Sequence, residues 1–497
     1  MCSDNRFLWK VGLQNSAAKY LTSEDFGYEL TVLGTSLGRK QTWVLELNHD
    51  ETVYIRNHLQ RYITVDKYGA VKCESEKQSD DGKFIVEYSL DGSGRWSFKN
   101  EKYGKYFGGN DKKVLCVALN ASEAEMTLWF VQMAIHPQIV LHNKRRKLYF
   151  ALEENQIRCQ DLIPWGPNSI FILEFYAGKY LIKTCDNRYL LKNGQLTNTR
   201  EQEARFTLEL RVNKESKLEG IAFKDNEGKY LAGVGGGAAI LKSRNKKITD
   251  DELFQVEKSQ PQVAFLAANG NFASIKSGFE LFASSKQPTK KEIFQLEYDK
   301  SSKKWCILTS ESKYWSVNKN NGIEATSSQR TPECLFTFEW KCGDVTISAS
   351  NGNYMGILPN GQLIAKKIAV GENETFRVRL ENRPLLVLKS EFGYVGKKKS
   401  SANDSEYVCN KSEYEVLSLD HGEKGTYHIK GDHGKYWSMN NTSVFATDKK
   451  PEPFVLELVG DSSLVILAPN NQYIVGEHIG RFQATTQVVQ KSCIWEF

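Results

Sequence analysis

One short pattern recurs twelve times along the chain: a small or polar residue, then an aromatic residue, then an apolar residue. Successive aromatic positions are 37 to 44 residues apart, a regularity that indicates internal repeats. The aromatic positions are Tyr20, Tyr62, Tyr106, Tyr149, Tyr189, Tyr230, Phe272, Tyr314, Tyr354, Tyr394, Tyr436 and Tyr473. The fold must therefore be built from twelve units of about forty residues, in the range typical of repeat architectures.

A second element precedes each following aromatic run, and it has the pattern of a strand. The segments FILEF at 171–175 and FTLEL at 206–210 alternate in character with period two. No long apolar stripe at helical spacing appears. We therefore predict an all-β protein in which the aromatic and aliphatic side chains of each strand face the core, while Glu or Thr faces water.

Two all-β architectures fit twelve units of about four strands each. A β-propeller would need twelve blades, beyond the usual range, and the Gly-His and Trp-Asp marks of the common propeller repeat are missing. A β-trefoil closes three units into a six-stranded barrel capped by three hairpins. The segments HPQ at 136–138, QPQ at 260–262 and NRP at 382–384 follow units three, six and nine. We predict four tandem β-trefoils, at residues 1–134, 135–257, 258–381 and 382–497.

Composition excludes several function classes. The net charge of +6 is spread over quarters of −1 to +4, below the balance expected of a nucleic-acid-binding domain. The first ten residues do not read as a secretion signal, and no window approaches eighteen apolar residues, so we expect neither secretion nor membrane insertion. Ten scattered cysteines without a C-x-x-C pair predict free thiols and no zinc site.

Catalysis finds little support in the sequence. The chain has no G-x-S-x-G motif and no P-loop, and its eight histidines form no metal-ligand pair at helical spacing. The glycine-rich stretch at 233–237 precedes a strand-like AAILK, which predicts a turn. We therefore expect no enzymatic activity, no metal and no cofactor.

A carbohydrate-binding trefoil is the alternative function. Lectin trefoils of the ricin type carry a Gln-x-Trp in most repeats, and this chain has it once, at 41–43.

Several basic clusters are predicted to lie in loops and could bind an acidic partner. They include the pair Arg39 and Lys40 near the start of the chain and a run of four that opens the second domain. That run consists of Lys144, Arg145, Arg146 and Lys147. The other clusters are Lys112 with Lys113, Lys286, Lys290 with Lys291, Lys303 with Lys304, Lys366 with Lys367, and Lys397 to Lys399.

The chain as a whole resembles the fascin family. The resemblance is carried by the order and spacing of AIHPQ at 134–138, IPWG at 163–166, DELF at 251–254, NGQL at 360–363, NRP at 382–384 and WEF at 495–497. It implies a monomer that cross-links actin filaments (F-actin) into tight parallel bundles, in the cytoplasm, the actin cytoskeleton and cell protrusions such as filopodia.

The resemblance also implies a main filament-binding surface where the first and last domains meet. The matching positions are Lys19, Glu24, Arg39, Lys40, Glu391 and Lys398. Ser36 matches a serine whose phosphorylation switches bundling off. Gly38, Phe392 and Val475 stand where the family has basic residues. Because the family's lysine-rich third-domain patch is also missing here, we predict a second surface at 144–147 or at the lysine pairs 290–291 and 303–304.

Overall fold

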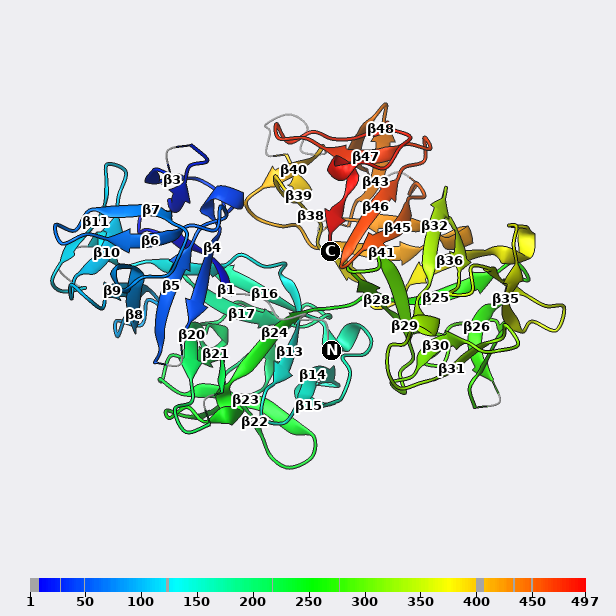
Figure 1. Ribbon diagram of the computed structural model, residues 1–497, viewed down its shortest axis with the longest axis horizontal. Coiled ribbons are helices and arrows are strands. Elements are labelled where there is room, and N and C mark those ends of the chain that lie inside the picture. The colour runs from blue at the N-terminus through cyan, green and yellow to red at the C-terminus, as the bar shows by residue number, and fades with distance from the viewer. Residues whose placement is uncertain are drawn as a thin grey trace. The chain divides into compact units, whose positions relative to one another are not determined.

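The computed structural model describes residues 9–26, 28–48, 50–121, 125–216, 218–276, 278–398, 406–431, 434–447 and 450–497. These residues form 49 strands and ten 3-10 helices of three residues each (Figure 1). No helix among them is long and apolar enough to cross a membrane. The prediction of an all-β protein is confirmed.

The first domain is a six-stranded barrel with three cap hairpins. Its barrel strands are β1 (Trp9–Gln14), β4 (Trp43–Leu47), β5 (Thr52–Arg56), β8 (Lys83–Tyr88), β9 (Trp96–Asn100) and β12 (Phe130–Met133). Neighbours pair in this order, β12 returns to β1, and a bridge from Trp96 to Trp129 closes the ring. The caps are β2 (Tyr20–Ser23) with β3 (Leu30–Gly34), β6 (Tyr62–Val65) with β7 (Val71–Ser75), and β10 (Tyr106–Gly109) with β11 (Val114–Ala118).

The second domain repeats this plan. Its barrel strands are β13 (Gln138–Asn143), β16 (Phe171–Tyr176), β17 (Lys179–Lys183), β20 (Thr207–Val212), β21 (Glu219–Lys224) and β24 (Phe254–Lys258). Its caps are β14 (Leu148–Glu153) with β15 (Gln156–Asp161), β18 (Tyr189–Leu190) with β19 (Leu196–Thr197), and β22 (Tyr230–Val234) with β23 (Ala239–Asn245). The glycine-rich stretch at 233–237 covers the end of β22 and the turn that leads to β23.

The third domain has the same order of strands. Its barrel consists of β25 (Gln262–Ala267), β28 (Phe294–Asp299), β29 (Lys304–Leu308), β32 (Thr337–Lys341), β33 (Asp344–Ser348) and β36 (Thr375–Leu380). Its caps are β26 (Phe272–Lys276) with β27 (Glu280–Ser285), β30 (Tyr314–Val317) with β31 (Ile323–Ser327), and β34 (Tyr354–Ile357) with β35 (Leu363–Lys367).

In the fourth domain the first barrel strand is split in two. The barrel consists of β37 (Leu385–Leu386) and β38 (Lys389–Ser390), then β41 (Leu417–His421), β42 (Tyr427–Lys430), β45 (Val455–Gly460), β46 (Ser463–Leu467) and β49 (Trp495–Glu496). The caps are β39 (Gly393–Lys397) with β40 (Tyr407–Lys411), β43 (Tyr436–Asn440) with β44 (Ser443–Thr447), and β47 (Tyr473–Gly476) with β48 (Phe482–Thr486).

The four sheets thus form four β-trefoils in tandem. The described strands of each sheet stay within one predicted domain, except that β24 ends at Lys258, one residue beyond the second range. Residues 4–164 and 168–258 form one compact unit, which contains the first two sheets. Residues 165–167 and 259–497 belong to the other unit, which contains the last two.

The repeated aromatic residue marks the point where the chain leaves a barrel strand and enters a cap hairpin. In eleven units the residue two positions earlier has a positive φ, which reverses the chain in a tight turn. These left-handed residues are Ala18, Gln60, Gly104, Lys147, Asn187, Gly228, Gly270, Ser312, Gly352, Gly434 and Asn471. In most units the register then shifts at or just after the aromatic residue, for example between Tyr230 and Leu231.

This change of direction places the next side chain in the barrel core. The residue after the aromatic is at most 1% exposed in all twelve units and belongs to one of the two large hydrophobic clusters. These residues are Leu21, Ile63, Phe107, Phe150, Leu190, Leu231, Ala273, Trp315, Met355, Val395, Trp437 and Ile474. The aromatic ring itself lies outside both large clusters, although Tyr230 is only 4% exposed.

The tyrosine hydroxyl instead donates a hydrogen bond to a glutamate of the barrel strand that pairs with the strand leading into the cap, as β20 pairs with β21. Seven units share this bond, at 2.7–3.2 Å between oxygens. The pairs are Tyr62–Glu46, Tyr106–Glu87, Tyr149–Glu257, Tyr189–Glu174, Tyr230–Glu209, Tyr314–Glu297 and Tyr473–Glu457. Burial, reinforced by the neighbouring glutamate, raises the pKa of Tyr106 and of Tyr314 to about 12. The hydrogen bond between tyrosine and glutamate links the cap hairpin to the barrel in these seven units.

The prediction that these glutamates face water is wrong for several of them. Glu209 is 2% exposed and Glu457 is 1% exposed. Glu209 also pairs with Arg211 and Lys224, at 2.6 and 3.3 Å, so its charge is compensated inside the domain. The period-two pattern identified the face of the strand correctly, but it could not show that the repeated tyrosine covers that face.

We predict that Tyr230→Phe lowers the free energy of unfolding by about 1–2 kcal/mol, because Glu209 loses one donor. Tyr230→Ala should cost about 3–5 kcal/mol, since it also removes the buried ring. Tyr354→Phe is the matched control, because the Tyr354 hydroxyl has no hydrogen-bond partner among the described residues and the corresponding Glu339 is exposed. Thermal melts of the three variants would check this, and equal melting of Tyr230→Phe and the parent would contradict it.

Candidate functional site

The first candidate surface lies beside the first cap of the first domain. Arg39 and Lys40 are in the 3-10 helix η1 (Arg39–Gln41), which follows β3. The Lys40 ammonium contacts Glu24 at 2.7 Å and Asp25 at 3.4 Å, and Arg39 contacts Asp25 at 3.5 Å. The structure therefore brings three predicted site residues, Glu24, Arg39 and Lys40, into one cluster and adds Asp25 to it.

His58, from the turn between β5 and β6, completes this cluster. Its Nε2 lies 2.8 Å from Asp25 Oδ1, and its side chain is 6% exposed. The hydrogen bond from His58, with help from Lys40, lowers the pKa of Asp25, and the hydrogen bond to Glu24 raises the pKa of Lys40. Both ion-pair partners therefore stay charged near neutral pH. Sequence reasoning missed Asp25 and His58, since neither lies in a basic run.

Arg39 remains the most accessible cation of this cluster. Its side chain is 72% exposed, against 40% for Lys40. Ser36 is exposed in the loop between β3 and η1, where its carbonyl accepts a hydrogen bond from the Gly38 amide at 3.2 Å. Lys19 is half-buried just before Tyr20. The accessible positive charge of the surface is therefore smaller than the sequence suggests.

The fourth-domain residues of the predicted main surface also have partners. Glu391 accepts from Lys491 at 2.8 Å, and Lys398 contacts Glu406 at 3.3 Å. These residues belong to a different compact unit from Arg39 and Lys40. Of the positions that depart from the family, Val475 is 8% exposed, so a lysine there would have to bury its stem in the cap.

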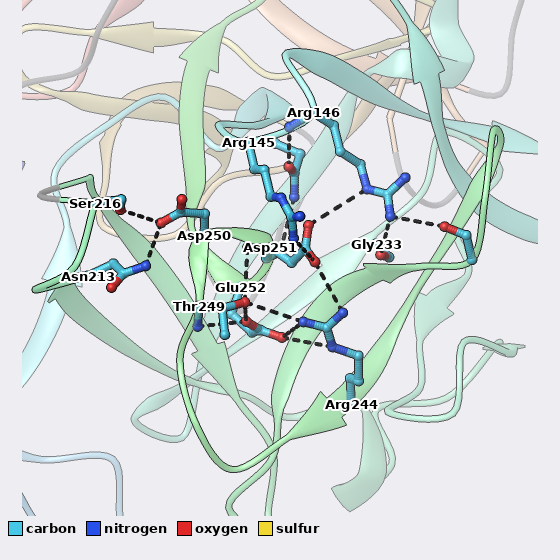
Figure 2. A network of polar contacts seen from close by, with 12 residues as sticks. Arg145, Arg146, Asn213, Ser216, Gly233, Arg244, Thr249, Asp250, Asp251 and Glu252 are labelled. Atoms are coloured by element: carbon cyan, nitrogen blue, oxygen red, sulfur yellow. Dashed lines mark hydrogen bonds and ion pairs between the residues drawn. The ribbon is translucent and has the colours of Figure 1, made fainter.

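The second candidate surface, at 144–147, is part of a polar network inside the second domain (Figure 2). Arg145 contacts Asp251 at 2.8 Å, and Arg244 contacts Asp251 at 3.1 Å and Glu252 at 2.6 Å. Asp251 and Glu252 lie in the helix η6 (Asp250–Glu252) and are 4% and 0% exposed. The two acidic residues of the DELF motif, Asp251 and Glu252, are thus buried anions that bind arginine side chains.

The other residues of this run also have structural roles, and Lys144 is half-buried, with its amide donating to the Leu253 carbonyl at 3.3 Å. The Arg146 guanidinium donates to the carbonyls of Gly233 and Gly235, at 3.1 and 3.0 Å, and so holds the glycine-rich turn (Figure 2). Lys147 is exposed and is the left-handed residue of its repeat, with φ of 56°. Arg145, 60% exposed in its side chain, and Lys147 are therefore the members most open to a partner.

The third-domain lysine pairs do not form one cluster. Lys290 and Lys291 precede β28, whereas Lys303 and Lys304 follow its far end, since Asp299 pairs with Lys304 in the β28–β29 ladder. Six residues of strand separate the pairs by about 17 Å or more. Three of these four lysines are exposed, and Lys304 is half-buried. They are two separate candidate surfaces.

The described residues contain no group of three or more His, Cys, Asp and Glu side chains that could hold a metal ion. Among the described cysteines, seven of the nine are buried thiols. Burial raises the pKa of Cys73 to about 12, so this thiol is a poor nucleophile. The fold and these loops define a four-trefoil scaffold that carries charged surface clusters.

Comparison with known proteins identifies the family. A model of the Fascin domain matches residues 17–131, 141–256, 268–378 and 393–497. The chain is 35% identical to Fascin-2 of Bos taurus over 494 residues, 98% of both chains. It is 32% identical to Fascin of Strongylocentrotus purpuratus over 507 residues, which cover 98% of this chain and 99% of that one. The chain belongs to the fascin family of actin-bundling proteins.

We predict that Asp251→Asn lowers the free energy of unfolding by about 1.5–3 kcal/mol, because it weakens charge-assisted bonds to Arg145 and Arg244. Glu153→Gln is the control, since its ion pair with Arg158 is partly exposed, at 49% and 34% of the two side chains, and should contribute less than about 1 kcal/mol. Thermal melts of both variants check this. A larger loss of stability in Glu153→Gln than in Asp251→Asn would show that the network does not stabilise the domain.

Proposed function

We propose that this protein cross-links actin filaments into tight parallel bundles as a monomer, through at least two charged surfaces on one chain. The observation that carries the proposal is the match of the Fascin domain in all four trefoils. Four domains in one chain offer loops on separate units, so a second subunit is not needed. The main surface includes Lys19, Glu24, Arg39, Lys40, Glu391 and Lys398.

Electrostatics supports this assignment for the first-domain cluster. An actin filament exposes acidic surface, to which the accessible Arg39 guanidinium and the Lys40 ammonium would bind. Glu24 and Asp25 already contact Lys40. Filament carboxylates must therefore compete with them, and binding at this cluster depends on the balance between cations and acids.

Regulation at Ser36 follows from the same balance. A phosphate on this exposed serine adds nearly two negative charges close in sequence to Arg39 and Lys40. With Glu24 and Asp25 present, that addition makes the cluster net negative, so we expect phosphorylation to weaken filament binding.

The protein would act in the cytoplasm, in the actin cytoskeleton of cell protrusions, without enzymatic activity, membrane insertion or nucleic-acid binding. A carbohydrate-binding role remains the alternative.

We predict that Arg39→Glu combined with Lys40→Glu abolishes bundling and leaves weaker filament binding. Low-speed pelleting of actin measures bundling, and high-speed pelleting measures binding. Because surface substitutions usually cost no more than about 0.5 kcal/mol, circular dichroism should match the parent.

Lys112→Glu with Lys113→Glu is the matched control for this variant. It reverses two exposed charges in another turn of the same domain. Parent-like bundling of the Arg39 and Lys40 variant, or equal loss in the control, would overturn the assignment of the main surface.

Three further variants locate the second surface. Charge is reversed at Lys147, at Lys290 with Lys291, and at Lys303 with Lys304. Arg145 is left unchanged because it pairs with buried Asp251. The variant that removes the second surface should no longer pellet actin at low speed. It should still pellet with actin filaments at high speed, because the main surface still binds one filament. If all three variants bundle like the parent, none of these clusters is the second surface.

A further inference from the structure

A cavity of about 250 Å³ lies in the compact unit that contains the first two domains. The segment from Tyr88 to Trp96 of the first domain forms one side, and β17, β20, β21 and the residues beside them form the other. Four cationic and two acidic side chains line it, an excess of two positive charges. They are Arg95, Lys179, Arg205, Lys224, Glu209 and Asp225.

The walls of this cavity are fixed by bonds between the two domains. The Tyr88 hydroxyl donates to the Leu210 carbonyl at 2.7 Å, and the Trp96 indole donates to the Leu208 carbonyl at 3.0 Å. A Cβ on Gly94 would lie 2.9 Å from the Gly178 carbonyl oxygen, so the two backbones approach too closely for a side chain. The cavity is therefore preformed.

Among the described residues, two of the four cations have an ion-pair partner and two do not, although Arg205 Nη2 donates to the Arg200 carbonyl at 3.1 Å and the Arg205 guanidinium lies over the Tyr176 ring. Arg95 pairs with Asp91 at 2.9 Å, and Lys224 pairs with Glu209 at 3.3 Å. The Lys179 ammonium has no ion pair or hydrogen bond among the described residues, and burial together with repulsion from Arg205 lowers its pKa. The Arg205 Nε is buried without a hydrogen-bond partner. An anion between Lys179 and Arg205 would relieve both.

Asp225 adds an acceptor that the fold does not use. Its Oδ1 accepts from the amides of Glu227 and Lys229 in the repeat turn, each at 2.9 Å, whereas its Oδ2 is buried without a partner. In four of the equivalent turns the residue is an asparagine, at positions 15, 57, 100 and 143, and the side-chain amides at 57 and 143 donate within the chain as follows. Asn57 donates to Ser23 at 2.8 Å, and Asn143 donates to the Asp251 carbonyl at 3.0 Å.

We propose that this cavity binds a small phosphorylated polyol, such as a sugar phosphate. Lys179 and Arg205 would bind the phosphate with charge-assisted hydrogen bonds, and a ligand hydroxyl would donate to Asp225 Oδ2. The volume is slightly below that of pockets for drug-sized molecules, which suits a ligand of one sugar and one phosphate. The proposal is independent of actin binding.

Isothermal titration of the full chain with glucose 6-phosphate, inorganic phosphate and glucose tests the proposal without actin. Glucose 6-phosphate should bind the parent, and Lys179→Met should weaken that binding about tenfold or more. Asp225→Asn should weaken glucose 6-phosphate but not phosphate, and it is compatible with the turn because equivalent turns contain asparagine. Lys183→Met is the matched control, since Lys183 lies on the same strand outside the cavity.

Three results would overturn the proposal. These are no binding of glucose 6-phosphate to the folded parent, equal losses in Lys179→Met and Lys183→Met, or glucose bound as tightly as its phosphate. The last result would instead support the carbohydrate-binding alternative. Thermal melts of each variant establish that the chain is folded before titration.

Discussion

The junction between each barrel strand and its cap hairpin is the constraint on which the fold depends. A left-handed residue turns the chain in eleven units, and the residue after the repeated aromatic enters the core. In seven units the tyrosine hydroxyl donates a hydrogen bond to a glutamate of the neighbouring barrel strand, as Tyr230 donates to Glu209 at 2.7 Å. This bond holds barrel and cap together outside the core cluster in those seven units, among them the unit that contains the run at 144–147.

Periodicity in the sequence was enough to predict the architecture, because each repeat must solve the same geometric problem. It predicted twelve units, four trefoils and the all-β class. It could not show that Tyr230 lies outside the core cluster, because the side on which a ring packs depends on a register shift that has no signature in residue type. For the same reason, the pattern wrongly predicted that the buried side chains of Glu209 and Glu457 face water.

The candidate surfaces were less predictable than the fold, because a basic run does not show which carboxylates fold against it. Lys40 contacts Glu24 and Asp25, and Arg145 contacts buried Asp251, which is 106 residues away in sequence. The run at 144–147 contains arginines that stabilise the second domain as well as the exposed Lys147. Long-range ion pairs of this kind reduce the charge that a partner meets, and only the folded chain shows them.

Low-speed actin pelleting by the unmodified chain, across a series of salt concentrations, tests the central claim most directly. If exposed cations at Arg39, Lys40 and a second cluster hold acidic filaments together, bundling is strong at low salt. It should then weaken steeply towards physiological ionic strength, where screening acts beyond about 8 Å. Absence of bundling at every salt concentration would contradict the filament cross-linking function, and bundling that does not change with salt would contradict its electrostatic basis.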